Sequence, residues 1–235
     1  MKKVLVTGAN KGIGFEIAKQ LSKKGLHVLL GARDINRGKA AVNEINSDGG
    51  KVSFIQLDLK SEESIHRAVE EMKKDHPDLS LLINNAGIGG NMEHGPMETD
   101  MRTLREAFEV NFFGTFELTR GLLPLIKENH GTIVNVTMEM ASLAILSEGI
   151  LPNSFAYNTS KTANNALMVG LARELQDSNA QIFAVTPGPT STDLNDHYPL
   201  GKSPAEGAKI IVDYATDLKR HHGQMLMKDD KIMPW

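Results

Sequence analysis

Cysteine is absent from the 235-residue chain. Without it there is no disulfide scaffold, no thiolate zinc site and no cysteine nucleophile. Long hydrophobic runs are absent as well, since no apolar stretch reaches the roughly 18 residues that a membrane-spanning helix needs. The N-terminal run MKKVLVTGANKG is basic, but its apolar part is too short for a signal peptide. We therefore expect a cytoplasmic protein that does not engage a membrane.

A strong charge of either sign is also lacking. The chain carries 26 Lys and Arg against 29 Asp and Glu, a net charge of −3. There is no long basic run, which argues against nucleic acid as a partner. With 40% hydrophobic and 23% charged residues, the composition is typical of a globular protein rather than a disordered one.

Short apolar runs rich in β-branched residues alternate along the chain with longer helical patterns. The expected strands are 3–7, 27–31, 51–58, 79–84, 131–137 and 181–186, and the expected helices are 12–24, 36–47, 61–75, 101–128, 154–176 and 203–219. The strands are mostly apolar throughout, which is typical of a parallel sheet covered on both faces. The pattern predicts an α/β, doubly wound Rossmann sheet with helices on both faces, as a single domain over 1–235.

Three longer irregular stretches each follow an expected strand. They span 85–100, 138–153 and 187–202. In an open α/β sheet, ligands bind beyond the carboxyl ends of the strands. The functional site is expected in these loops.

The first strand runs directly into the glycine-rich turn TGANKGIG, with glycines at 8, 12 and 14. Such a turn lets a pyrophosphate approach the backbone N–H groups at a helix N-terminus. The spacing is Gly-x3-Gly-x-Gly, and a glycine-rich turn without a ligand is the alternative. Because the turn lies between a strand and a helix, we interpret it as a dinucleotide site.

The second strand ends in Arg33 rather than in an acid. An acid there would hydrogen-bond a ribose 2′-hydroxyl, whereas Arg33 together with Lys11 favours a 2′-phosphate, hence NADP(H) over NAD(H). Asp34 follows immediately and works against this interpretation. The alternative for Arg33 is an ordinary solvated surface arginine.

Tyr157 and Lys161 are four residues apart in an expected helix and so share one face. A nearby ammonium stabilises a tyrosinate, so Lys161 is expected to lower the pKa of Tyr157 from about 10 towards the working pH. The tyrosine could then exchange a proton with a carbonyl or alcohol oxygen. Taken alone the pair is weak evidence, because chance pairs at this spacing are common.

In combination these motifs carry a family resemblance. The glycine turn, the run Asn84-Asn85-Ala86-Gly87, Asn111, the Tyr157–Lys161 pair and Pro187-Gly188 together resemble the short-chain dehydrogenase/reductase family, in its order and over essentially the whole chain. The glycine turn, the run around Arg33 and the tail from Gly223 to Trp235 look most like its carbonyl-reductase branch.

The resemblance implies specific roles. Asn111, Tyr157 and Lys161 are the implied catalytic residues, with Asn111 relaying water to Lys161. The residues expected to bind the cofactor, from the residue pattern and the resemblance together, are Gly8, Asn10, Lys11, Gly12, Ile13, Gly14, Arg33, Asp58, Leu59, Asn85, Ala86, Gly87, Tyr157, Lys161, Pro187, Gly188, Thr190 and Thr192. Asn111 also lies among apolar neighbours, so it needs buried hydrogen-bond partners.

The chain departs from the family pattern where the fifth strand ends. The family has a catalytic serine there, and the ungapped alignment puts Met138 in its place. A thioether cannot donate a hydrogen bond, and losing one donor to a developing oxyanion costs about 10²–10³ in rate. Thr137 and Ser142 are possible substitutes. Met138 and Met140 either bind the substrate as part of an apolar pocket or are simply buried in the hydrophobic core.

The sequence thus predicts an NADP(H)-dependent oxidoreductase, attenuated by Met138, that acts on a small-molecule carbonyl or alcohol, expected to be an apolar aldehyde or ketone. One rival is an NADP(H)-binding regulatory or scaffold protein with little turnover. The other, ranked last, is a sugar-nucleotide epimerase.

Two further expectations concern metals and assembly. The eight histidines show no metal-ligand spacing, and His221-His222 are expected to be a solvated turn. The oligomeric state, a monomer or a homodimer or tetramer, is left open.

Overall fold

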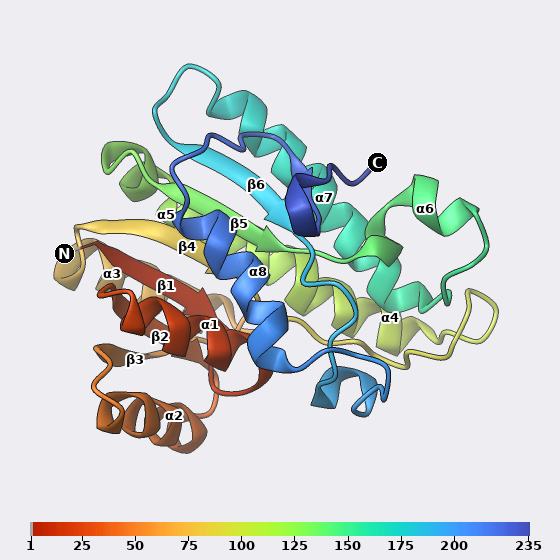
Figure 1. Ribbon diagram of the computed structural model, residues 1–235, viewed down its shortest axis with the longest axis horizontal. Helices are drawn as coiled ribbons and strands as arrows, with labels where there is room; N and C mark the ends of the chain where they lie inside the picture. Colours follow the sequence, from red (N-terminus) through yellow and green to blue (C-terminus); the bar gives the residue numbers. More distant parts are fainter. Residues whose placement is uncertain (1) are drawn as a thin grey trace.

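A computed structural model describes residues 2–235 and contains one seven-stranded parallel sheet in the order β3-β2-β1-β4-β5-β6-β7 (Figure 1). The strands are β1 (Lys3–Thr7), β2 (His27–Ala32), β3 (Val52–Gln56), β4 (Leu79–Asn84), β5 (Thr132–Val136), β6 (Gln181–Val185) and β7 (Met225–Leu226). The doubly wound α/β class predicted from the sequence is confirmed.

Helices cover both faces of this sheet. They are α1 (Gly12–Lys23), α2 (Ile35–Ser47), α3 (Glu62–Asp75), α4 (Met101–Phe108), α5 (Thr115–Glu128), α6 (Leu143–Ser147), α7 (Phe155–Glu174) and α8 (Pro204–Thr216). Helix α1 packs on α8, and Figure 1 shows both crossing in front of the strands. Helix α5 packs on α3 and α7 over the opposite face.

The alternation of side chains along each strand divides the core into two halves. Leu5 and Leu29 contribute to the half that α3, α5 and α7 cover. Their neighbours Val4, Val28 and Leu30 contribute to the half under α1 and α8. Both sets are fully buried. The apolar runs in the sequence are therefore explained by strands that bury both faces.

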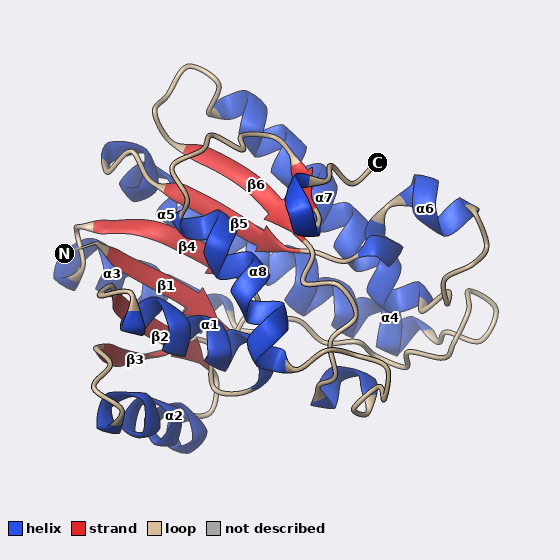
Figure 2. Cartoon of the chain, in the orientation of Figure 1, coloured by secondary structure: helices blue, strands red, loops and turns tan. Residues whose placement is uncertain are grey.

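The strand order reverses beside β1, because β2 follows on one side and β4 on the other. Such a switch point opens a crevice at the carboxyl ends of the strands. Figure 2 shows the arrowheads pointing to one side of the molecule, where the long loops gather. The loops 85–100, 138–153 and 187–202 therefore reach the same edge of the sheet.

Three features differ from the expected elements. The short strand β7 was not predicted, and the expected loop 138–153 contains α6 and a 3₁₀ turn at Glu139–Ala141. The expected helix 101–128 is helical throughout, but Glu109–Gly114 winds as a π-helix between α4 and α5. Among residues 2–235, no helix is both long and apolar enough to span a membrane.

Candidate active site

The glycine turn and the start of the 85–100 loop are held together by Thr7. Its Oγ1 accepts hydrogen bonds from the backbone N–H groups of Asn85 and Ala86, at 3.0 Å each. Asn85 Nδ2 donates to the carbonyls of Thr7 and Gly8, at 2.9 and 3.3 Å. A Cβ on Gly8 would lie 2.9 Å from Ala86 Cα, which explains the glycine. Two motifs far apart in sequence therefore form one wall.

The N-terminus of α1 is free to receive an anion. Gly8 and Gly12 have φ of +63° and +59°, and no side chain caps the helix at Lys11. The first turn carries no acidic residue. The N–H groups of Gly12, Ile13 and Gly14 therefore lack side-chain partners. This arrangement fits the pyrophosphate of a dinucleotide, with Asn10, partly exposed, in the same turn.

At the end of β2, Arg33 is exposed and Asp34 is engaged elsewhere. The Asp34 carboxylate accepts a hydrogen bond from the Arg37 N–H at 2.9 Å and caps α2. Arg33 makes no ion pair within the described part of the chain. Asp34, the acid that works against a 2′-phosphate, therefore caps the N-terminus of α2. Asp58 is partly exposed after β3, and Leu59 is buried beside it.

Asn111 lies in the π-helical turn and is fully buried. Its Nδ2 donates to the Ile88 carbonyl and to Ser160 Oγ, each at 2.9 Å, and its Oδ1 accepts from the Ile88 N–H at 2.8 Å. The expected buried partners are therefore present. Ser160 in turn donates to the Tyr157 carbonyl at 2.9 Å, so Asn111 is tied to α7.

Tyr157 and Lys161 share one face of α7, as predicted, with Lys161 Nζ 5.9 Å from the centroid of the tyrosine ring. Lys161 is 3% exposed, and its ammonium donates to the Val136 carbonyl at 3.0 Å. A Cβ on Gly87 would lie 3.5 Å from Lys161 Nζ and 3.2 Å from Asn111 Oδ1. Lys161 and Asn111 thus meet beside Gly87, and Tyr157 lies next to Lys161.

The pKa of Tyr157 differs from the expectation. Burial lowers the pKa of Lys161 to about 8. Tyr157 retains some exposed surface, but the surrounding protein removes enough water to raise its pKa to about 12. The prediction that Lys161 lowers the pKa of Tyr157 is wrong for the protein alone, because desolvation of the phenolate dominates.

Met138 is separated from the end of β5 by Thr137, and both proposed substitute hydroxyls are buried. Thr137 Oγ1 donates to Asn165 Oδ1 at 2.8 Å. Ser142 is fully buried, and its Oγ caps α6 by accepting from the Ile145 N–H at 3.2 Å. Met138 and Met140 are both half-buried, so they are not simply core.

The turn after β6 contains the predicted Pro187 and Gly188, and it is held by Thr186, Glu139 and Lys202, to which the sequence assigned no role. Gly188 has φ +70°, and the Lys202 ammonium donates to the Pro187 carbonyl at 2.7 Å. Thr186 Oγ1 donates to Glu139 Oε2 at 2.9 Å and accepts from the Gly188 N–H at 3.0 Å.

Side chains at 190 and 192 hold the same loop. Thr190 Oγ1 donates to the Gly188 carbonyl at 2.9 Å, and Thr192 caps the next turn. A Cβ on Gly12 would lie 3.9 Å from Thr192 Cγ2, so this loop reaches the glycine turn. Glu139 is 47 residues from Thr186 in the chain, so no local signal points to it, whereas Lys202 ends the 187–202 loop in which the site was expected.

The prediction of a solvated turn at His221-His222 is wrong. His221 is 5% exposed, lies between the rings of Phe183 and Tyr214, and pairs with Asp217 at 2.8 Å. His222 Nε2 lies 2.8 Å from the Ala172 carbonyl. Both histidines therefore anchor the segment leading to β7.

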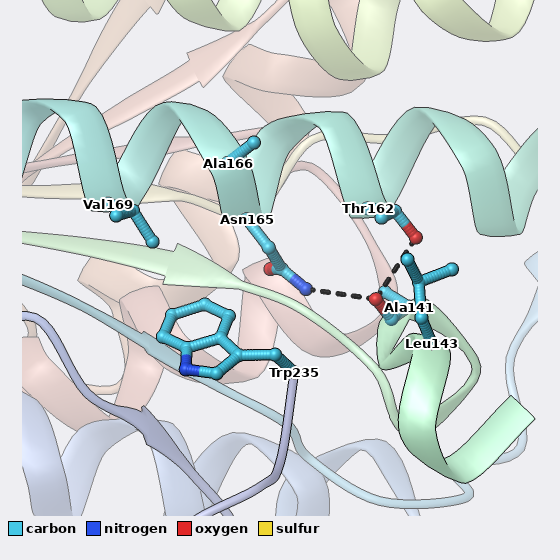
Figure 3. Close-up of a pocket in the computed structure, with 7 residues that line it drawn as sticks. All are labelled: Ala141, Leu143, Thr162, Asn165, Ala166, Val169 and Trp235. Carbon is cyan, nitrogen blue, oxygen red and sulfur yellow. Dashed lines mark hydrogen bonds between the residues drawn. The ribbon is translucent and has the colours of Figure 1, made fainter.

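A pocket of about 290 Å³ lies between α7, the segment around Ala141 and the C-terminal Trp235 (Figure 3). Its lining residues are Ala141, Leu143, Thr162, Asn165, Ala166, Val169 and Trp235. Thr162 and Asn165 both donate to the Ala141 carbonyl, at 3.0 and 3.3 Å. Since neither Tyr157 nor Lys161 lines this pocket, it is not the place of their chemistry.

Comparison with known proteins agrees with this geometry. Residues 2–202 match the family model described as short chain dehydrogenase. Carbonyl reductase [NADPH] 1 of Mus musculus is 34% identical, over 98% of this chain and 97% of its own length. The 3-oxoacyl-[acyl-carrier-protein] reductase FabG of Aquifex aeolicus is 31% identical, over 91% of this chain and 90% of its own.

Among solved structures, a short chain dehydrogenase from Shigella flexneri complexed with NADP superposes with a TM-score of 0.85 at 26% identity, covering 96% of each chain. An alcohol dehydrogenase from Thermococcus sibiricus has a TM-score of 0.85 at 24% identity, covering 99% of this chain and 97% of its own, and supports the fold. These relatives are oxidoreductases that resemble this chain over nearly its whole length. The chain therefore belongs to the short-chain dehydrogenase/reductase family of nicotinamide-dependent oxidoreductases.

Proposed function

We propose that the chain reduces a small-molecule carbonyl, or oxidises the corresponding alcohol, with NADP(H) as cofactor. When bound, NADPH would supply the hydride that adds to the carbonyl carbon. The single observation that carries the proposal is the buried Lys161, held by the Val136 carbonyl on the face of α7 that bears Tyr157. Within residues 2–235 this ammonium has no ion-pair partner, which points to a role in chemistry.

Each residue then has a definable task. Tyr157 would give its hydroxyl proton to the carbonyl oxygen as the hydride adds to carbon. Lys161 would stabilise the resulting phenolate and hydrogen-bond the ribose next to the nicotinamide. Asn111 fixes the helix turn that carries Ser160, and it would connect Lys161 to water.

The cofactor-binding residues follow the wall described above. Gly8, Gly12, Ile13 and Gly14 would hold the pyrophosphate, and Asn85, Ala86 and Gly87 would lie along the adenosine ribose. Asp58 and Leu59 would flank the adenine. Pro187, Gly188, Thr190 and Thr192 would meet the nicotinamide end.

The preference for NADP(H) rests on Arg33 and Lys11. Arg33 is exposed and makes no ion pair within residues 2–235, and Asp34 caps the N-terminus of α2. Two cations, with Asp34 facing the N-terminus of α2, favour a 2′-phosphate over a 2′-hydroxyl. NADPH also stands in the name of the mouse relative, and the Shigella structure contains NADP.

We further propose that turnover is attenuated because Met138 supplies no hydrogen bond to the developing oxyanion. The Thr137 hydroxyl donates to Asn165, and Ser142 is fully buried at the start of α6, which argues against either hydroxyl as a replacement. Half-buried Met138 and Met140 would instead give the substrate an apolar surface, which favours an apolar aldehyde or ketone.

The test is NADPH consumption over a panel of activated aldehydes and diketones, for the native chain, Met138→Ser and Tyr157→Phe. We expect slow native turnover, a gain of about tenfold or more in Met138→Ser, and loss in Tyr157→Phe with NADPH binding retained. The gain should fall in kcat rather than in KM, because the serine acts on the transition state.

The second candidate function is an NADP(H)-binding regulatory protein with little turnover, and Met138 is the observation that favours it. Tight NADPH binding with no turnover by the native chain, and turnover restored in Met138→Ser, would support that function instead. Turnover that is equal in both proteins would show that Met138 does not attenuate the reaction.

A further inference from the structure

An ion pair joins the glycine turn to the loop after β6. Lys11 Nζ lies 2.6 Å from Asp193 Oδ2, although the two residues are 182 positions apart in sequence. Both side chains are more than half exposed, at 58% and 56%. Lys11 precedes the first turn of α1, at the anion-binding end of that helix. The carboxylate therefore stands beside a place where the proposed function requires phosphate groups.

The loop around Asp193 is arranged so that this carboxylate is held in position. Thr192 and Asn195 cap the turn reciprocally, and Asn195 Nδ2 donates to the Thr190 carbonyl at 2.9 Å. Asp196 and His197 both adopt left-handed backbone conformations, with φ of +48° and +57°. Such conformations persist only where surrounding contacts enforce them. They bring His197 Nε2 to 3.1 Å from Asp193 Oδ1.

The pair has an electrostatic consequence for Lys11. Its ammonium already has an anionic partner in the protein alone, and the same contact holds the pKa of Asp193 below its usual value. Arg33, by contrast, has no ion-pair partner in the described part of the chain. A 2′-phosphate that recruits Lys11 must therefore compete with the Asp193 carboxylate for the same ammonium. An exposed pair of this kind is weak enough to be exchanged for a dianion.

We propose that Asp193 is a residue that determines cofactor preference, because it competes with the 2′-phosphate of NADP(H) for Lys11. This inference rests on the proposed function, which gives Lys11 the 2′-phosphate. His197 remains as a partner for Asp193 when Lys11 leaves. Removing the Asp193 charge should free Lys11 and sharpen the discrimination between nucleotides with and without a 2′-phosphate.

Binding of adenosine 2′,5′-bisphosphate and of adenosine 5′-monophosphate, measured by calorimetry, tests this without any chemistry at the nicotinamide end. Asp193→Asn should bind the bisphosphate about two- to fivefold more tightly than the native chain, and the monophosphate less than twofold more tightly. The gain should shrink as salt is raised, because both partners are exposed. Asp196→Asn is the matched control, since it removes the same charge from the same loop, and it should reproduce no such gain.

A double-mutant cycle with Lys11→Met separates competition for Lys11 from general repulsion. In the Lys11→Met background, Asp193→Asn should no longer tighten the bisphosphate. Three results would overturn the proposal: weaker bisphosphate binding by Asp193→Asn, an equal gain in Asp196→Asn, or a gain that persists without Lys11. If the native chain itself fails to prefer the bisphosphate, the proposed NADP(H) preference fails, and this inference with it. A failure of Asp193→Asn alone leaves the proposed function standing.

Discussion

At the scale of single residues, the buried ammonium of Lys161 should make stability depend on pH. Its pKa is about 8 in the folded chain against 10.5 for a free lysine. Between these values the unfolded chain binds a proton that the folded chain does not, so stability rises with pH. Between about pH 7 and pH 9.5, we expect a rise of up to roughly 2 kcal/mol in the free energy of unfolding from this group.

Urea denaturation of the native chain and of Lys161→Met over this range measures the effect. The rise should be missing in Lys161→Met and retained in Lys11→Met, whose lysine is exposed in the native chain. The range stops below pH 10 because Tyr157, with a folded pKa of about 12, then acts in the opposite direction. Parallel pH profiles for the native chain and Lys161→Met would contradict the prediction.

Individual residues also show where sequence reasoning reaches its limit. The spacing of Tyr157 and Lys161 placed both on one helix face, because helical periodicity is local. It could not give the pKa of Tyr157, which depends on how much water the folded protein removes. Nor could it predict that Thr137 and Ser142 would be engaged by Asn165 and by α6, since those contacts form only in the folded chain.

At the scale of elements, the π-helical turn Glu109–Gly114 positions Asn111, and Gly114 allows this turn to pack closely against Leu59. A Cβ on Gly114 would lie 2.1 Å from the Leu59 carbonyl oxygen, so Gly114→Ala must shift the backbone. We expect a loss of about 1–3 kcal/mol in the free energy of unfolding and a lower kcat, because Asn111 moves with the turn. Chemical denaturation and steady-state kinetics measure the two effects.

Gly170 on α7 provides the control for this substitution. It is exposed, and a Cβ there would meet nothing within 4 Å. Gly170→Ala should stabilise the chain by roughly 0.5–1 kcal/mol, because alanine favours a helix over glycine. If Gly114→Ala behaved like Gly170→Ala, the close approach to Leu59 would not be what fixes the π-helical turn.

The elements themselves were mostly predictable, and the exceptions have physical causes. The apolar run from Leu79 to Asn84 predicted β4 with its observed bounds, because a strand buried on both faces has a strong sequence signal. Strand β7 is two residues long, too short for any periodicity. The turn at 109–114 continues the helical pattern of the sequence, so the sequence does not distinguish its π-helical winding from an α-helix.

At the scale of the whole molecule, repeated strand–helix units predicted the sheet class but not the site's tertiary links. Right-handed crossovers and a switch point beside β1 follow from general rules about α/β sheets. The contact of Lys11 with Asp193, by contrast, depends on the path of the loop after β6. The sequence thus predicted that the candidate site lies at one edge of the sheet, but it did not predict that Lys11 pairs with Asp193 there.

The proposed cofactor would contact segments from β1 to the loop after β6, so its binding should stabilise the whole molecule. A ligand at 100 times its Kd adds about 2.7 kcal/mol to the free energy of unfolding. For a chain of this size, that corresponds to a rise of roughly 5–11 °C in Tm. NADPH should produce this shift in Tm, and NADH at the same concentration a smaller shift.

Arg33→Met should reduce the NADPH shift towards that of NADH, because the variant lacks the guanidinium that would meet the 2′-phosphate. Differential scanning fluorimetry of both proteins with both cofactors measures this, and equal shifts for NADPH and NADH in the native chain would refute a preference based on Arg33.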